Sequence, residues 1–248
     1  MDTVCVLIVN YNMPERADAL AEHIKNNVKW PHDLHVIDNG SDISEPATNT
    51  TVRLPENCQT TMGWLAGLSD ARARRIKPYL AYLFLITSAE LLPHTGDVIT
   101  PLAQVLKDDD NAVGVHPCLS PDSTTVWDHL KNRGTGKPRR TWMIDNICSL
   151  YRADWWHSMG GFDPALYMAH GIDLETCWKA RQQKRGLYIH DGVEIAKTSH
   201  VGYMMGRMNM SYQQRQIDAR DNMDKVLGER YGENYWQRLI DEYREELI

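Results

Sequence analysis

The sequence predicts an α/β fold: a mixed sheet with helices on both faces, followed by a helical C-terminal extension. Two observations support this fold class. The first is the continuous apolar segment VCVLIVN at 4–10, which is typical of a strand covered on both faces in a parallel sheet. The second is the alternation of strand and helix patterns over the first ~115 residues, which is typical of doubly wound sheets. We expect a domain at 1–205 and the extension at 206–248.

Local patterns predict the individual elements. After strand 4–10, the spacing of Asn12, Pro14 and Glu15 indicates a helix start, and we expect Asn12 to cap that helix. Apolar and β-branched runs bounded by turn formers predict the strands. In chain order, the other predicted elements are strands at 34–38 and 51–55, a helix at 63–76, strands at 79–86, 112–117 and 141–152, a helix at 173–183, strands at 186–190 and 193–203, and helices from 211 onward.

The tail carries an apolar stripe at helical spacing. Its members are Trp236, Leu239, Ile240, Tyr243 and Leu247. A stripe of this kind covers the domain itself, forms a homodimer or docks on a partner enzyme.

Composition narrows the function classes. The chain has 248 residues, of which 42% are hydrophobic and 24% charged, as expected for a globular protein with one sizeable core. A net charge of −6 argues against non-specific binding to nucleic acid or an anionic membrane. The five cysteines are scattered, without a C-x-x-C pair, which favours a reducing compartment and argues against a zinc site. With no basic leader and no membrane-length apolar run, we expect a cytoplasmic protein without a membrane span.

Polar side chains stand where three of the predicted strands end. Asn10, Asp38 and Thr87 occupy these positions. Open α/β sheets bind ligands in the crevice at the carboxyl ends of their strands, so we expect these side chains to line one site.

A series of segments resembles family 2 glycosyltransferases with the GT-A fold. In chain order they are VCVLIVNYN, HVIDNGSD, GGFDPALYMAHGIDLETCWKARQQ and SHVGY, which span roughly 4–203. The resemblance implies an inverting glycosyltransferase that moves a hexosyl or deoxyhexosyl group. Its donor would be a nucleotide sugar, UDP- or dTDP-linked, and its acceptor the hydroxyl of a glycan or another molecule.

The resemblance also implies roles for individual residues. Asn10 and Tyr11 would lie beside the nucleotide, and Asp38 would contact its base or ribose, unless Asp38 only opens the DNGSD turn. Asp173 would be the catalytic base, since the start of a helix favours the ionised form of a carboxylate; the alternative is a simple first-turn acid. Asp145, Trp156 and Glu175 would face the acceptor, although packing in the core is the alternative for Trp156.

One motif of the resembled family is missing. Where an Asp-x-Asp usually holds a divalent metal against the diphosphate, this chain has Thr87, Ser88 and Ala89. We expect Thr87 and Ala89 to lie against the donor.

Three explanations for the missing motif stay open. Cationic side chains could meet the diphosphate charge, and the candidates are Lys197, His200 and Arg207, which would make the enzyme metal-independent. Alternatively, Mn²⁺ or Mg²⁺ could bind through Glu90 and His200. The protein could also be a non-catalytic subunit that binds a nucleotide sugar. We favour the first explanation, with no metal cofactor.

Overall fold

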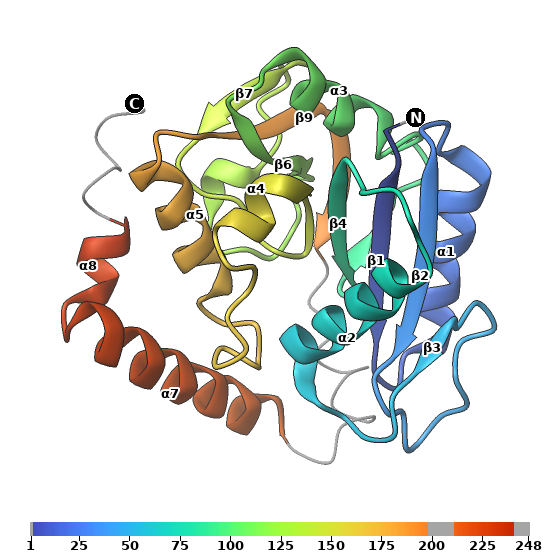
Figure 1. Ribbon diagram of the computed structural model, residues 1–248, viewed down its shortest axis with the longest axis horizontal. Coiled ribbons are helices and arrows are strands. Elements are labelled where there is room, and N and C mark those ends of the chain that lie inside the picture. The colour runs from blue at the N-terminus through green and yellow to red at the C-terminus, as the bar shows by residue number, and fades with distance from the viewer. Residues whose placement is uncertain (1, 198–210, 241–248) are drawn as a thin grey trace.

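A computed structural model of the protein describes residues 2–197 and 211–240 and shows one mixed sheet with helices packed against it (Figure 1). The strand order is β3-β2-β1-β4-β8-β6-β9-β5, and β7 pairs with β9. β3, β2, β1 and β4 run parallel, whereas β8 is antiparallel to both of its neighbours. The predicted α/β class with a mixed sheet is therefore confirmed.

The parallel part of the sheet is formed by the first third of the chain. Its elements are β1 (Val4–Asn10), α1 (Pro14–Asn27), β2 (His32–Asp38), β3 (Val52–Arg53), α2 (Gln59–Ala73) and β4 (Ala81–Ile86). From β1 the chain crosses to β2 on one side, and through α2 it returns to β4 on the other side of β1. Because parallel crossovers are right-handed, α1 and α2 cover opposite faces of the sheet. Every residue of β1 is buried as a result.

The rest of the chain completes the sheet and adds the C-terminal helices. The elements are β5 (Ala89–Glu90), α3 (Thr100–Asp108), β6 (Ala112–Leu119), the 3-10 turn η1 (Asp128–Leu130), β7 (Pro138–Thr141), β8 (Cys148–Arg152), α4 (Ala153–Ser158), α5 (Ile172–Gln182), β9 (Gly186–Lys197), α7 (Tyr212–Tyr231) and α8 (Tyr235–Ile240). β9 is one strand where the sequence predicts separate strands at 186–190 and 193–203, and the structure describes it only as far as Lys197.

Two local predictions are wrong. The strand predicted at 141–152 is interrupted: Thr141 ends β7, and β8 begins only at Cys148. The apolar residues between them are buried by packing instead of strand pairing; the backbone N–H of Ile144, for instance, donates to Cys177 Sγ at 3.4 Å. Asn12 does not cap α1, whose N-cap is Met13. Asn12 has a φ of 56°, and its Oδ1 accepts from the backbone N–H of Asp42 at 3.1 Å, so it holds the loop after β2.

The C-terminal helices lie beside α5 and below the loop that precedes it (Figure 1). Ala219 and Leu227 of α7 and Leu239 and Ile240 of α8 are buried, so part of the predicted apolar stripe covers the domain. Trp236 is 40% exposed and stacks on Trp127 at a ring separation of 6.1 Å. Tyr243 and Leu247 lie outside the described residues, and a homodimer stays a prediction. Among the described helices, none is long and apolar enough to cross a membrane.

Candidate active site

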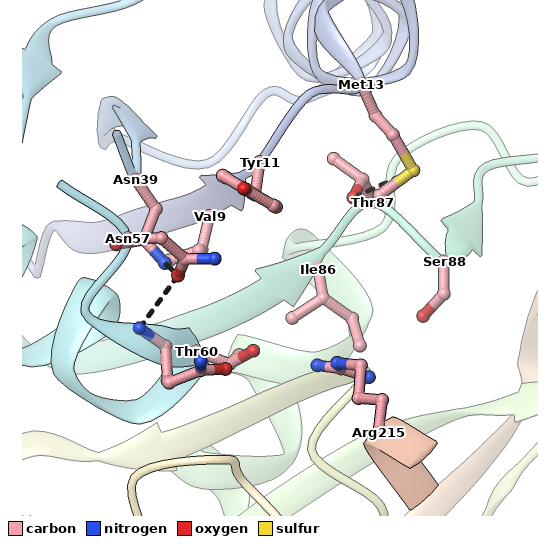
Figure 2. Close-up of a pocket in the computed structure, with 11 residues that line it drawn as sticks. Val9, Tyr11, Met13, Asn39, Asn57, Thr60, Ile86, Thr87, Ser88 and Arg215 are labelled. Atoms are coloured by element: carbon pink, nitrogen blue, oxygen red, sulfur yellow. Dashed lines mark hydrogen bonds between the residues drawn. The ribbon is translucent and has the colours of Figure 1, made fainter. Parts of the chain in front are cut away.

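A pocket opens at the carboxyl ends of β1 and β4, where the sequence places polar strand ends (Figure 2). Its volume is about 130 Å³, below the roughly 300–1,000 Å³ of pockets that enclose whole drug-sized ligands, so it accommodates one part of a larger ligand. The described residues that line it are Val9, Tyr11, Met13, Asn39, Asn57, Gln59, Thr60, Ile86, Thr87, Ser88 and Arg215.

Tyr11 lines this pocket, whereas Asn10 does not. The Tyr11 hydroxyl donates to Asp42 Oδ1 at 3.0 Å, which holds the phenol ring against the loop after β2. Asn10 is fully buried, and its Oδ1 accepts from the backbone N–H of Met13 at 3.0 Å. Asn10 thus fixes the backbone at Met13, and Met13 lines the pocket as Tyr11 does.

Asp38 does not line the pocket, although its neighbour Asn39 does. Its side chain is buried and accepts from the Ser41 hydroxyl. Arg53 Nε lies 3.2 Å from Asp38 Oδ2, close enough for an ion pair but without hydrogen-bond geometry. The wall itself is made by Asn39, whose Nδ2 donates to Asn57 Oδ1 at 3.0 Å. Contact between Asp38 and a base or ribose stays a prediction.

Sequence reasoning missed this amide-rich wall. The turn DNGSD is a signal for Asn39, but Asn57 is brought in by a close approach of two loops. Gly40 has a φ of 68°, and a Cβ there would meet the backbone of Glu56 at 2.2 Å. Only glycine permits this contact, so Gly40 is the residue that joins the two loops.

After the end of β4, where the Asp-x-Asp motif of the resembled family would stand, an arginine side chain binds backbone carbonyl groups. Arg16 Nε donates to the carbonyl oxygen of Thr87 at 2.7 Å, and its Nη2 donates to that of Ala89 at 3.5 Å. The same guanidinium lies 3.9 Å from Glu90 Oε2. Glu90 thus has a cationic neighbour of its own. Thr87 and Ser88 line the pocket, whereas Ala89 is buried in β5.

Lys197 is brought beside this strand end by the pairing of β5 with β9, in which Ala89 lies opposite Lys197. Lys197 Nζ donates to Asp145 Oδ2 at 2.6 Å, and the carboxylate is mostly buried. His116 on β6 adds no charge to this pair near pH 7. It is buried, and burial lowers its pKa to about 4, so its ring is neutral. Lys197 is predicted to contact the donor and Asp145 the acceptor, and in the structure the two form an ion pair.

Asp173 completes this group at the start of α5. Its Oδ1 accepts from the backbone N–H of Leu174 at 2.9 Å, and its side chain is half-buried. Burial, helped by the nearby charge of Asp145, raises its pKa to about 7, although the Leu174 N–H and Lys197 act in the opposite direction. Desolvation here outweighs the helix dipole, which by itself favours the ionised carboxylate. The role of Asp173 as the catalytic base stays a prediction.

The other two residues assigned to the acceptor have partners in the core. Glu175 is 2% exposed, and Lys179, Arg230 and Tyr231 all donate to its carboxylate. Trp156 is buried in an aromatic cluster, with its ring 5.8 Å from that of Phe84. These contacts give both residues structural roles, and their contact with an acceptor stays a prediction. His200 and Arg207 lie outside the described residues.

The raised pKa of Asp173 predicts a pH-dependent rate. If its carboxylate removes a proton from the acceptor, kcat/KM falls about tenfold per pH unit below pH 7. Buried Tyr151 and Cys177 also face Asp173; burial raises the pKa of both, so neither ionises in this range. A rate profile from pH 5.5 to 9 tests the expectation, and a rate independent of pH between 5.5 and 7 would contradict it.

Stability gives an independent readout of the same group. Asp173 binds its proton more tightly in the folded protein than in the unfolded chain, where an aspartate has a pKa near 3.9. Its contribution to stability is therefore complete at low pH and is lost as the pH rises through about 7. We expect Asp173→Asn to raise the melting temperature at pH 8 more than at pH 5.

Comparisons with known proteins agree with this architecture. No family model and no curated protein matches the sequence. One similar structure is that of GalNAc-T7 with UDP, GalNAc and Mn²⁺, with a TM-score of 0.60 and 13% identity; the match covers 79% of this chain but only 44% of that one. Another is the mannosyltransferase PcManGT from Pyrobaculum calidifontis in complex with GDP-Man and Mn²⁺, with a TM-score of 0.55, 12% identity, and coverage of 97% and 74%.

The predicted GT-A fold is thereby confirmed. The chain spans less than half the length of GalNAc-T7. Membership of family 2 and the inverting mechanism stay predictions.

Proposed function

We propose that this protein is an inverting glycosyltransferase that moves a hexosyl or deoxyhexosyl group from a nucleoside diphosphate to an acceptor hydroxyl. The observation that carries the proposal is the group formed by Asp173, Asp145 and Lys197 beside the end of β4. It combines a carboxylate whose pKa is about 7 with an ammonium group held by a second carboxylate. The fold supports the proposal, since the two similar structures are of proteins bound to UDP with GalNAc and to GDP-Man.

The reaction is a single displacement at the anomeric carbon. Asp173 takes the proton of the acceptor hydroxyl, and the acceptor oxygen forms a bond to the anomeric carbon from the face opposite the leaving group. The bond from that carbon to the phosphate oxygen breaks, and its electron pair leaves with the nucleoside diphosphate. Lys197 stabilises the charge that develops there, and Asp145 orients Lys197.

The donor nucleotide would bind in the pocket at the strand ends. Tyr11 offers an aromatic face, and Asn39 and Asn57 offer amide groups that can pair with a base or ribose. Thr87 and Ser88 would lie on the side of the phosphates. Uridine or deoxythymidine is our first choice of nucleoside.

The described residues do not fit a metal at this strand end. Thr87, Ser88 and Ala89 supply no carboxylate, and Glu90 is next to Arg16. Within 2–197 and 211–240, no three His, Cys, Asp or Glu side chains are grouped so that they could hold an ion. We therefore propose metal-independent transfer.

Chelation and a lysine variant test this proposal together. We expect hydrolysis of UDP-sugars, or transfer to an acceptor, to persist in EDTA. We expect Lys197→Met to lower kcat by about 10²–10³-fold, the usual effect of removing one group that stabilises charge in the transition state. A matched control is Lys107→Met, because Lys107 lies on α3 in a half-exposed ion pair with Asp2. Activity abolished by EDTA and restored by Mn²⁺ would refute the metal-independent mechanism.

A non-catalytic nucleotide-sugar-binding subunit is the second candidate. The observation that favours it is the loss of all acidic groups from the Asp-x-Asp position. Binding of UDP or UDP-sugar without turnover, with every acceptor tried, would decide for this alternative.

A further inference from the structure

A cationic side chain of the C-terminal extension reaches the candidate donor pocket. Arg215, in the first turns of α7, lines the pocket together with residues that follow β1, β2 and β4. Figure 2 shows its guanidinium below Ile86, directed into the pocket and away from the α7 backbone. Among the described lining residues, Arg215 is the charged one; the others are apolar or neutral polar.

Several contacts fix the helix that carries Arg215. The Ser211 hydroxyl caps α7 by accepting from the backbone N–H of Gln214 at 3.1 Å. Gln216 Oε1 lies 3.3 Å from His170 Nε2, and Asn222 Nδ2 donates to the carbonyl oxygen of Ala165 at 3.1 Å. Both partners belong to the segment that leads into α5. The position of Arg215 is thus coupled to the segment that carries Asp173.

Packing along α7 reinforces these polar contacts. Ala219, Met223 and Leu227 recur every fourth residue and are buried. Gly171 leaves room for this stripe, because a Cβ there would meet Met223 Cγ at 2.7 Å. Arg230, near the end of α7, then binds the buried carboxylate of Glu175. The helix is held at both ends and along its length.

The position of Arg215 in the pocket indicates which part of a ligand it would bind. The amide groups of Asn39 and Asn57 lie on one side of the pocket, and Ile86, Thr87 and Ser88 lie on the side of the β4 end (Figure 2). Arg215 enters below Ile86, next to the strand end that would face phosphates. A guanidinium binds phosphate oxygens through two parallel, charge-assisted hydrogen bonds, whereas a neutral base or ribose gains little from its charge.

We propose that Arg215 binds the diphosphate of the donor, so that the C-terminal extension supplies part of the donor site. The inference rests on the proposed function and adds to it a phosphate-binding residue from outside the α/β domain. Because α7 also contacts the segment before α5, through His170 and Ala165, binding of the diphosphate by Arg215 would connect the donor site to the segment that leads into the helix of Asp173.

The experiment compares nucleotides that differ only in their phosphates. Calorimetry with uridine, UMP and UDP, each with wild type, Arg215→Ala and Arg215→Lys, separates phosphate contacts from base contacts. We expect Arg215→Ala to weaken UDP binding about tenfold or more, while uridine affinity stays within about twofold. Arg215→Lys should retain part of the UDP affinity, because it keeps the charge but not the paired hydrogen bonds. GDP with guanosine gives the same comparison for a purine donor.

A matched control lies on the same helix. Arg220 is exposed and pairs with Asp224 at 3.6 Å, so Arg220→Ala should leave UDP affinity unchanged. Equal UDP affinity in wild type and Arg215→Ala, or an equal loss of uridine and UDP affinity, would overturn the inference about Arg215. Failure of wild type to bind UDP or GDP at all would instead overturn the proposed function, so the two failures are distinguishable.

Discussion

Asp173→Asn is expected to lower kcat for sugar transfer by about 10²–10⁴-fold, the range over which a positioned general base acts. The substitution keeps the size of the side chain and its hydrogen bond to the backbone N–H of Leu174. It removes the basic oxygen that would accept the acceptor proton. Affinity for UDP should stay within about twofold, because Asp173 lies outside the residues that line the candidate donor pocket. Steady-state rates and calorimetry on the same preparations give both values.

The chain offers a close control for this substitution. Asp154 stands in the first turn of α4 and accepts from the backbone N–H of Trp155 at 2.6 Å, as Asp173 does in α5, but it is exposed. Asp154→Asn should therefore leave kcat at the wild-type level. A kcat for Asp173→Asn equal to that of Asp154→Asn would mean that another group is the base, or that the protein does not catalyse transfer.

The sequence alone predicts the parallel sheet and the position of Asp173, but not the environment of its carboxylate. The continuous apolar run at 4–10 and the helical pattern after it predict a parallel sheet, and the handedness of the crossovers then leaves few arrangements. The position of Asp173 at a helix start was also predictable. Its pKa was not, because burial of the carboxylate and the nearby charges of Asp145 and Lys197 depend on the tertiary fold, which does not follow from the periodicity around Asp173.

Long-range contacts account for what the sequence did not predict. Arg215 lies in a polar helix, and nothing in its neighbourhood distinguishes it from Arg220 until α7 is placed on the domain. Glu175 appears as an ordinary first-turn acid, yet its carboxylate is buried and bound from α7. In both cases the decisive contacts are made with residues far away in the chain, 55 positions away for Glu175 and Arg230. Hydrophobic patterns carry no pairing information over such distances.

Arg230 is expected to matter most for stability, because two carboxylates depend on it. It binds Glu175, whose side chain is 3% exposed, and Asp163, whose side chain is 13% exposed. The charge of these two carboxylates raises the pKa of the Arg230 guanidinium against the effect of burial, so it is always protonated. The pair fastens the end of α7 to both the start of α5 and the loop before it.

Arg230→Met should lower the free energy of unfolding by about 2–3 kcal/mol, less than the 3–5 kcal/mol typical of breaking a fully buried pair, because Arg230 itself is 40% exposed. Lys179 and Tyr231 still donate to Glu175, which also limits the loss. Adding Glu175→Gln to Arg230→Met should restore part of the stability, since the uncompensated charge is then gone. Urea denaturation of the single and double variants measures the coupling between the two residues.

The same denaturation series distinguishes loss of the Arg230 ion pairs from a general effect of removing a cation from α7. Arg220→Met removes an exposed cation from the same helix and should change stability by no more than about 0.5 kcal/mol. A loss of stability in Arg230→Met no larger than that in Arg220→Met would show that the carboxylates of Asp163 and Glu175 do not hold the extension.

Because the position of Arg215 depends on the placement of α7, a destabilised Arg230→Met should also bind UDP more weakly while its affinity for uridine is kept. Loss of stability without a change in UDP affinity would mean that Arg230 anchors α7 to the domain but is not needed to position Arg215 for UDP binding.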